Sequence, residues 1–298
     1  MKNYKTISEL YISNGFPPPE NPLLGLVTFE ELKNCTFAET EFTMNFYKIA
    51  LKKVKSGTIL YGKTKYDHDN GSMAFVKPGQ KITMSDIELT EKGFMIYIDE
   101  DFLMNTNLYS EIKKYGFFDY EVNEALHLSP KEEETIWDLF HKIRLEYYNN
   151  QDDFSKDIML THIDSILKYS QRYYKRQFLN RTSISGTIIT RFTEILKLYF
   201  ESGKLQKEGL PTVKYMATQL SLSARYLSDL LKQETGKTAL EHIHISLVTE
   251  AKNLLLSTNN TVAETAYQLG FENPPYFSRL FKKEVGLTPT EYREQFLN

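Results

Sequence analysis

Residues 262–288 read VAETAYQLGFENPPYFSRLFKKEVGLT, and residues 213–238 read VKYMATQLSLSARYLSDLLKQETGKT. The two stretches align with Val213 opposite Val262 and, after one inserted residue, with Tyr226 opposite Tyr276. Each stretch has the pattern of a helix, a short turn and a second helix. A tandem duplication of this kind predicts two copies of one supersecondary motif near the end of the chain.

The second copy has an apolar stripe at helical spacing, formed by Val262, Ala266 and Leu269. Gly270 follows as a turn residue that can take a positive φ. The helix after the turn is predicted to bury its apolar side. The residues expected on that side are Tyr276, Phe277, Leu280 and Phe281.

The first copy repeats this design, with Ser223 as the cap of its second helix and Leu227, Leu230 and Leu231 facing inward. Between the copies, residues 238–257 are predicted to form a long helix that fixes their separation. Its expected apolar face consists of Leu240, Ile243, Leu247, Ala251 and Leu254. Two such motifs about 34 Å apart would meet successive major-groove faces on one side of a DNA duplex.

Residues 210–295 resemble the tandem helix-turn-helix domain of AraC/XylS-type transcription regulators. The most specific stretch runs from Ala263 to Asn273, continues from Tyr276 to Lys283, and closes from Gly286 to Arg293. The resemblance implies a DNA-binding regulator rather than an enzyme. It also implies double-stranded DNA as the partner and RNA polymerase as a further candidate partner.

The second helix of such a motif enters the major groove, where its exposed side chains read base edges. Arg225 and Arg279 are the strongest candidates, because arginine pairs bidentately with guanine. The expected base-facing residues are Ala224, Arg225, Ser228 and Asp229 in the first copy, and Pro274, Pro275, Ser278 and Arg279 in the second. The expected phosphate contacts are Lys232, Lys282 and Lys283.

The sequence departs from the family pattern at two places. Pro274 and Pro275 stand where a small or polar residue is usual, and they suit a first helical turn but offer no side-chain hydrogen bond for base reading. Asp229 stands where many relatives carry a basic residue. An acid at that place either accepts a hydrogen bond from cytosine or repels phosphate.

The first 125 residues or so alternate short β-rich runs with turn signals. Strands are predicted at residues 46–51, 58–62, 72–76 and 94–98, with an Asn70-Gly71 hairpin signal and a Pro78-Gly79 turn. The N-terminal half resembles the cupin-like effector domain common in the same family. The resemblance lies in this strand rhythm and in Pro78-Gly79. Aromatic side chains in this half are either β core or the lining of a ligand pocket, and they are Phe42, Phe46, Tyr47, Tyr61 and Phe75.

Helices are predicted at roughly 130–149, 154–178 and 184–202. Ser129 and Pro130 provide a cap and a proline at the first helical position. The third helix carries apolar residues at alternating steps of four and three, a coiled-coil rhythm that suggests a homodimer interface. These residues are Ile188, Phe192, Ile195 and Tyr199. Gly203, Gly209 and Pro211 mark a linker.

Together these patterns predict an α+β protein: an N-terminal cupin-like antiparallel β-barrel with flanking helices, followed by an all-α tandem helix-turn-helix domain. The expected divisions are a sensor domain at 1–128, a helical connector or dimerisation region at 129–203, and a DNA-binding domain at 204–298. A small-molecule effector in the sensor domain is a hypothesis that the resemblance suggests. The sequence names neither its ligand nor its operator.

The bulk composition is that of a globular protein, with 41% hydrophobic and 25% charged residues. The net charge is −3, with residues 204–298 at +1 (11 basic, 10 acidic) and the rest at −4 (25 basic, 29 acidic). Any DNA-binding charge must therefore be placed locally. No signal peptide or membrane span is evident, and the lone Cys35 cannot form an intrachain disulfide, so a cytoplasmic protein is expected.

No catalytic, metal-binding or cofactor-binding residue is predicted. His68 lies in a predicted turn, and a spacing of two on a helix points the rings of His242 and His244 apart. Two alternatives to a regulator stay open at this point. One is a cupin-type metalloenzyme with an appended DNA-binding domain, and the other is a protein–protein adaptor.

Overall fold

A computed structural model describes residues 1–32, 41–56, 60–61, 64–65, 71–83, 88–120, 124–150, 152–180 and 182–297. The chain divides into two compact units, Met1–Gln177 and Phe178–Asn298. We call them the N-terminal unit and the C-terminal unit. In the described parts of the chain, no helix is both long and apolar enough to cross a membrane.

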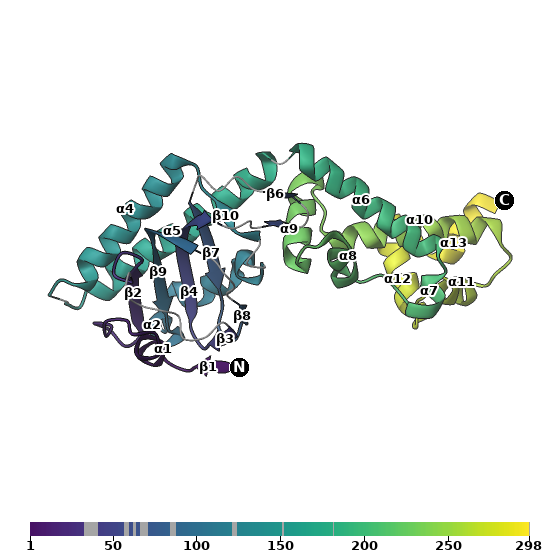
Figure 1. Ribbon diagram of the computed structural model, residues 1–298. Coiled ribbons are helices and arrows are strands. Elements are labelled where there is room, and N and C mark those ends of the chain that lie inside the picture. The colour runs from purple at the N-terminus through teal and green to yellow at the C-terminus, as the bar shows by residue number, and fades with distance from the viewer. Residues whose placement is uncertain are drawn as a thin grey trace. The chain divides into compact units, whose positions relative to one another are not determined.

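The N-terminal unit is built on a five-stranded sheet in which every pairing is antiparallel. Figure 1 shows β4 at its centre. The strands, in spatial order, are β10 (Leu126–His127), β7 (Ser72–Val76), β4 (Tyr47–Ser56), β9 (Glu88–Ile98) and β2 (Leu24–Thr28). Two smaller sheets are formed by β1 (Lys2–Tyr4), β3 (Glu41–Met44) and β8 (Ile82–Thr83), and by β5 (Leu60–Tyr61) and β6 (Thr64–Lys65).

The strands predicted at 46–51, 72–76 and 94–98 are confirmed as β4, β7 and β9. The Pro78-Gly79 turn is also present, since Gly79 has a φ of 77° and the Gln80 amide donates to the Lys77 carbonyl at 3.2 Å. Part of the 58–62 run, and Cys35, Asn70 and His68, lie outside the described residues. The antiparallel sheet was therefore predicted correctly. The described strands form three separate sheets, and closure into a cupin-like barrel stays a prediction.

The two faces of the five-stranded sheet have different coverings. On one face Phe94 stacks on Phe140 at 4.0 Å between ring centroids, and Phe75 lies 4.4 Å from Phe117. The opposite face, here called the inner face, contributes Ala50 and Tyr97 to a second core. The aromatic residues singled out in the sequence are divided accordingly. Phe42 and Phe46 belong to the inner-face core, Tyr47 and Phe75 contact Phe118 on the other face, and the side chain of Tyr61 is outside the described set.

Helices cover the sheet and extend the chain beyond it. The helix predicted from residue 130 begins at Pro130, and the Ser129 amide donates to the Glu132 carboxylate at 2.8 Å as a capping box requires. The helices of the N-terminal unit are α1 (Ile7–Asn14), α2 (Glu100–Leu103), α3 (Asn107–Glu111), the 3₁₀ turns η1 (Ile112–Lys114) and η2 (Gly116–Asp119), α4 (Pro130–Tyr147) and most of α5 (Ser155–Asn180).

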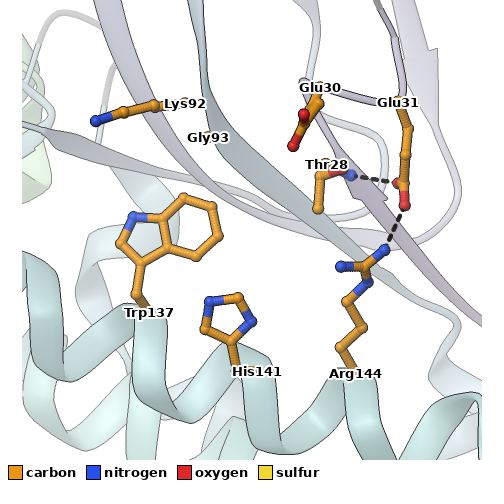
Figure 2. A pocket seen from close by; sticks show the side chains of 8 residues that line it. All are labelled: Thr28, Glu30, Glu31, Lys92, Gly93, Trp137, His141 and Arg144. Atoms are coloured by element: carbon orange, nitrogen blue, oxygen red, sulfur yellow. Dashed lines mark hydrogen bonds and ion pairs between the residues drawn. The ribbon is translucent and has the colours of Figure 1, made fainter.

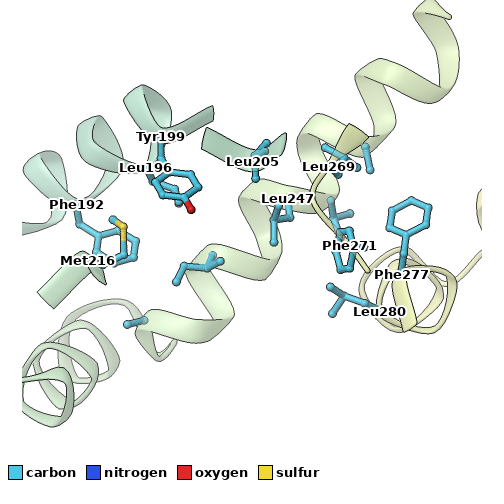
Figure 3. Close-up of a cluster of buried hydrophobic side chains, with 14 of the residues drawn as sticks. Phe192, Leu196, Tyr199, Leu205, Met216, Leu247, Leu269, Phe271, Phe277 and Leu280 are labelled. Atoms are coloured by element: carbon cyan, nitrogen blue, oxygen red, sulfur yellow. The ribbon is translucent and has the colours of Figure 1, made fainter. Parts of the chain in front are cut away.

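The C-terminal unit is all helical in its described residues. A single core runs through it and joins residues from both repeat copies (Figure 3), including Met216, Leu247 and Phe277. Its helices are α6 (Thr182–Glu201), α7 (Lys204–Glu208), α8 (Val213–Leu220), α9 (Ala224–Thr235), α10 (Ala239–Ser257), α11 (Val262–Gln268), α12 (Pro274–Val285) and α13 (Pro289–Leu297).

The helix α6 carries the residues expected at a dimer interface. Phe192 and Tyr199 are 2% and 4% exposed within the core of their own unit, and Ile188 and Ile195 pack against that core. The alternating spacing is therefore explained by packing within one chain. Dimerisation through these residues stays a prediction. The predicted domain boundaries at 128/129 and 203/204 also stay predictions. In the division into two compact units, α6 belongs to the same unit as the helices that follow it.

Candidate nucleic-acid interface

The repeat in the sequence is a repeat in structure. α8 and α9 form the first helix-turn-helix motif, and α11 and α12 form the second. Each first helix is capped by a threonine, with Thr212 accepting from the Tyr215 amide at 3.0 Å and Thr261 from the Glu264 amide at 3.2 Å. The position at which the first helix of each motif begins is therefore specified by a residue of the local sequence.

The turn between the two helices needs a left-handed residue in both motifs. Ser221 has a φ of 58°, and its counterpart Gly270 has a φ of 80°. A Cβ on Gly270 would lie 2.6 Å from the carbonyl oxygen of Leu205 and 3.2 Å from the backbone of Gly209. The segment from Gly203 to Pro211, which was predicted to be a linker, contains the helix α7. Because Leu205 and Gly209 lie so close to Gly270, this segment packs against the turn of the second motif. Gln206 also donates its side-chain amide to the Gln268 carbonyl at 3.2 Å.

The second helices bury the faces that the sequence predicted, with one exception. Leu227, Leu230 and Leu231 on α9 are buried, as are the matching Phe277, Leu280 and Phe281 on α12. Tyr226 is 1% exposed, whereas its counterpart Tyr276 is 42% exposed. The prediction that Tyr276 lies on the buried face is therefore wrong. Its aromatic type suggested core, and only the packing places it on the outer side of α12.

On α9 the predicted base-facing residues lie at the surface or partly buried, but two of them are engaged with each other. Arg225 donates through Nε to the Asp229 carboxylate at 3.0 Å. Ala224 and Ser228 are half-buried, and Lys232 is exposed near the end of the helix. Asp229, the acid that departs from the family pattern, therefore forms an ion pair with Arg225 of the same helix.

On α12 the predicted contacts form an exposed cationic surface. Arg279, Lys282 and Lys283 are exposed, and among the described residues no carboxylate lies within ion-pair distance of them. Pro274 and Pro275 occupy the first helical turn, and Asn273 caps it by accepting from the Tyr276 amide at 3.0 Å. Pro275 is exposed, and Pro274 and Ser278 are half-buried. Of the two second helices, α12 therefore carries the excess of positive charge, with three basic residues and one acidic residue against two of each on α9.

A hollow of about 530 Å³ lies beside Arg279 in the C-terminal unit. It is bounded by the α7 segment, the turn of the second motif and the start of α12. Its lining residues are Glu208, Gly209, Leu210, Gly270, Phe271, Glu272, Asn273, Tyr276 and Arg279. Tyr276 therefore shares this surface with Arg279, which makes it a candidate contact that the sequence reading missed.

The predicted long helix between the motifs is α10, with Thr238 as its N-cap. Its 19 residues span about 28 Å at ~1.5 Å per residue. Ile243, Leu247 and Ala251 are buried as predicted, but Leu240 is 48% exposed. The His242 ring lies 2.7 Å from the Thr235 hydroxyl, and burial lowers the pKa of His242. The His242 ring on α10 therefore has a hydrogen-bonding partner, Thr235, at the end of α9 in the first motif.

The N-terminal unit carries a surface groove of about 560 Å³ (Figure 2). Trp137 and His141 stack with ring centroids 5.4 Å apart, and Arg144 donates to the Glu31 carboxylate at 2.7 Å. The other lining residues are Thr28, Glu30, Lys92 and Gly93. None of these was singled out in the sequence, because they come from distant segments that only the fold brings together.

A family model described as a helix-turn-helix domain matches residues 216–295. The chain is 39% identical over 83 residues to the uncharacterized HTH-type transcriptional regulator YisR of Bacillus subtilis (strain 168), covering 28% of this chain and 29% of that protein. It is 34% identical over 76 residues to the HTH-type transcriptional activator RhaR of Yersinia pseudotuberculosis, covering 26% of each.

Among solved structures, the C-terminal domain of the two-component response regulator yesN from Fusobacterium nucleatum is 32% identical. That match covers 34% of this chain and 96% of that chain, with a TM-score of 0.30. The chain spans less than a third of the length of the curated relatives named above. The residues that the family model matches, 216–295, include nearly all of both repeat copies, and they form a helix-turn-helix domain of the AraC type.

Proposed function

We propose that this protein is a sequence-specific DNA-binding transcription regulator. The observation that carries the proposal is the pair of helix-turn-helix motifs at the two ends of α10, the second of which presents Arg279, Lys282 and Lys283 to solvent. An exposed recognition helix with arginine and lysine can combine base reading with phosphate contact. Local charge of this kind is sufficient even though the chain as a whole is at −3.

The similarity to proteins named as transcriptional regulators supports the same function. YisR is named as an HTH-type transcriptional regulator and RhaR as an HTH-type transcriptional activator. On this proposal the chain is a binding protein and not an enzyme, with double-stranded DNA as its principal partner and RNA polymerase as a second.

The N-terminal unit is proposed to be a cupin-like sensor for a small molecule, and the protein to act as a homodimer in the cytoplasm. The antiparallel sheet with a separate core on each face supports the sensor assignment. A ligand can change DNA binding only by its differential affinity for two states of the protein. A bound effector would therefore favour the state in which the DNA-reading motifs engage the operator, or the state in which they do not.

The proposal is tested by selecting bound genomic fragments with the full chain and measuring affinity at several salt concentrations. We expect one enriched sequence, bound with a steep decrease of affinity as salt rises. If no sequence is enriched, with or without candidate effectors, the regulator proposal fails. Salt-independent binding, or capture of a protein instead of DNA, would favour an adaptor.

A further inference from the structure

The α7 segment, which runs from Gly203 to Pro211, contacts both helix-turn-helix motifs. The helix α7 itself lies between two glycines with positive φ, Gly203 at 73° and Gly209 at 76°. Gly209 also has a ψ of −156°, a backbone conformation that is essentially restricted to glycine. The five-residue helix between them is too short to be stable by its own hydrogen bonds. The segment therefore depends on the contacts that it makes on either side.

Two of these contacts attach the segment to the side of the first motif. Lys204 donates through Nζ to the hydroxyl of Tyr215 on α8 at 3.0 Å, and the same Nζ lies 4.9 Å from the centre of that ring. Tyr215 packs against Tyr199 of α6 with ring centroids 5.1 Å apart. The Tyr199 hydroxyl donates to the Gly209 carbonyl at 3.0 Å. Both ends of α7 are therefore held next to α8.

The middle of the segment contacts the second motif. Gln206 donates its side-chain amide to the carbonyl of Gln268, the last residue of α11, at 3.2 Å. The Leu205 carbonyl lies so close to Gly270 that an added Cβ there would be 2.6 Å from it. The Leu205 side chain is 4% exposed, and Figure 3 shows it in the part of the core between Tyr199 and Leu269. The segment therefore joins the first motif to the end of α11 and its turn.

The long helix α10 connects the same two motifs through other elements. It packs against α9 of the first motif and against α11 and α12 of the second, whereas α7 packs against α6 and α11. A single connection between two bodies allows them to bend and twist about it. A second connection through different helices restricts that motion, so the two motifs are held at one distance and one relative orientation.

The placement of the two motifs matters because DNA presents its major groove at fixed intervals. Two recognition helices on one side of the duplex must meet grooves about 34 Å, or about 10 base pairs, apart. One base pair inserted between the two subsites moves the second by about 3.4 Å and rotates it by about a tenth of a turn. Two motifs in a fixed arrangement cannot follow this change without losing the contacts of one motif.

We propose that the α7 segment fixes the distance and orientation between the two motifs and so determines which spacing of DNA subsites the protein accepts. Tyr199, Lys204 and Gln206 are the positioning residues of this connection. The inference rests on the proposed function and deepens it, because it adds the spacing of the subsites to the base sequence that is recognised. None of the three residues has to touch DNA in this role.

The test compares the full chain with a triple variant, Tyr199→Phe, Lys204→Met and Gln206→Ala, which loses the three side-chain hydrogen bonds described above. The variant keeps the Tyr199 ring in the core and an unbranched side chain at residue 204. Lys207→Met is the matched control, because it removes one charge from an exposed position of the same helix. Gln206→Ala alone changes one exposed side chain and is expected to fold. Circular dichroism and urea unfolding establish that each variant is folded.

Spin labels measure the connection without any DNA. They are attached at Gln219→Cys on α8 and Ala263→Cys on α11, both exposed, with Cys35→Ser removing the native thiol. Pulsed electron paramagnetic resonance should give one narrow distance distribution for the parent chain and for Lys207→Met. The distribution should broaden in the triple variant and, to a smaller extent, in Gln206→Ala. An equally narrow distribution in the folded triple variant overturns the proposal, and so does an unchanged Gln206→Ala if the triple variant does not fold.

The DNA measurement uses the selected site and versions with one or two base pairs inserted between the two subsites. The wild-type chain and Lys207→Met should lose about tenfold or more in affinity for the first inserted base pair, and the triple variant only about two- to threefold. A triple variant weakened by the same factor at every spacing would show a merely structural role and overturn the proposal. If no sequence is selected at all, the proposed function fails, while the spin-label distances still decide whether α7 holds the motifs together.

Discussion

Arg225 and Asp229 form an ion pair along one turn of α9, with 3.0 Å between Nε and the carboxylate oxygen. Arg279 of α12, which stands opposite Asp229 when the two copies are aligned, has no such partner among the described residues. The two helix-turn-helix motifs are therefore unequal. The first pairs its arginine with an aspartate of the same helix, and the second leaves its arginine exposed, with no ion pair to a described residue.

Replacing Asp229 by asparagine should release Arg225 and remove one negative charge from the surface of α9. We expect DNA affinity to rise several-fold and base preference to sharpen at the positions under the first motif. Quantitative binding to a randomised site library measures both effects. Glu294→Gln, an exposed change on α13, is the control for charge alone. If Asp229→Asn instead loses specificity, the aspartate itself reads a base.

Arg279→Ala and Lys282→Ala should have different effects on binding. Loss of Arg279 is expected to relax specificity at one base position, by about 1–3 kcal/mol of discrimination. Loss of Lys282 should weaken binding evenly across sequences and reduce the salt slope by about 1. Binding isotherms on the selected site and its single-base variants, at four salt concentrations, separate the two roles. Identical effects of the two changes would contradict the assignment of base and phosphate contacts.

Tyr226 and Tyr276 occupy matching positions of the two motifs, and they should respond differently to truncation. Tyr226→Ala removes a fully buried ring and is expected to lower the free energy of unfolding by about 3 kcal/mol or more. Tyr276→Ala should cost much less stability but reduce DNA affinity. Urea unfolding and DNA titration of the same samples test this. A Tyr276→Ala protein with unchanged DNA affinity would limit this residue to a structural role.

Gly270→Ala should be more destabilising than Gly286→Ala, although both glycines have positive φ angles of 80° and 87°. At Gly286 nothing lies within 4 Å of an added Cβ, so only backbone strain of about 1–2 kcal/mol applies. At Gly270 the Leu205 carbonyl would have to move as well, adding about 1–3 kcal/mol. The comparison is made by urea unfolding of the full chain. Equal losses would mean that the α7 segment yields freely.

A fragment of residues 178–298 should be more stable than one of residues 204–298. The shorter fragment lacks α6 and with it Phe192, Leu196 and Tyr199, which are all buried in the core of the C-terminal unit. Each such side chain contributes about 1.5–3 kcal/mol on burial. Thermal unfolding of the two fragments measures the difference. Equal stability would support the boundary at 203/204 that the sequence suggested.

The sequence alone determined the features that repeat at short range. The tandem motif, the Ser223 cap, the Gly270 turn and the long helix α10 could all be predicted, because each depends on periodicity, capping residues and positive φ within a few residues of chain. The candidate DNA-contact residues followed from the same spacing, which names the side of a helix that its apolar stripe leaves free.

The tertiary structure alone decided the features that depend on distant segments. Tyr226 and Tyr276 share a residue type and a motif position, yet one is buried and the other is exposed, because different helices pack around them. The spacing along α6 resembles a dimer seam but is satisfied by the core of its own unit. Periodicity specifies which side of an element is apolar, whereas only packing specifies what covers that side.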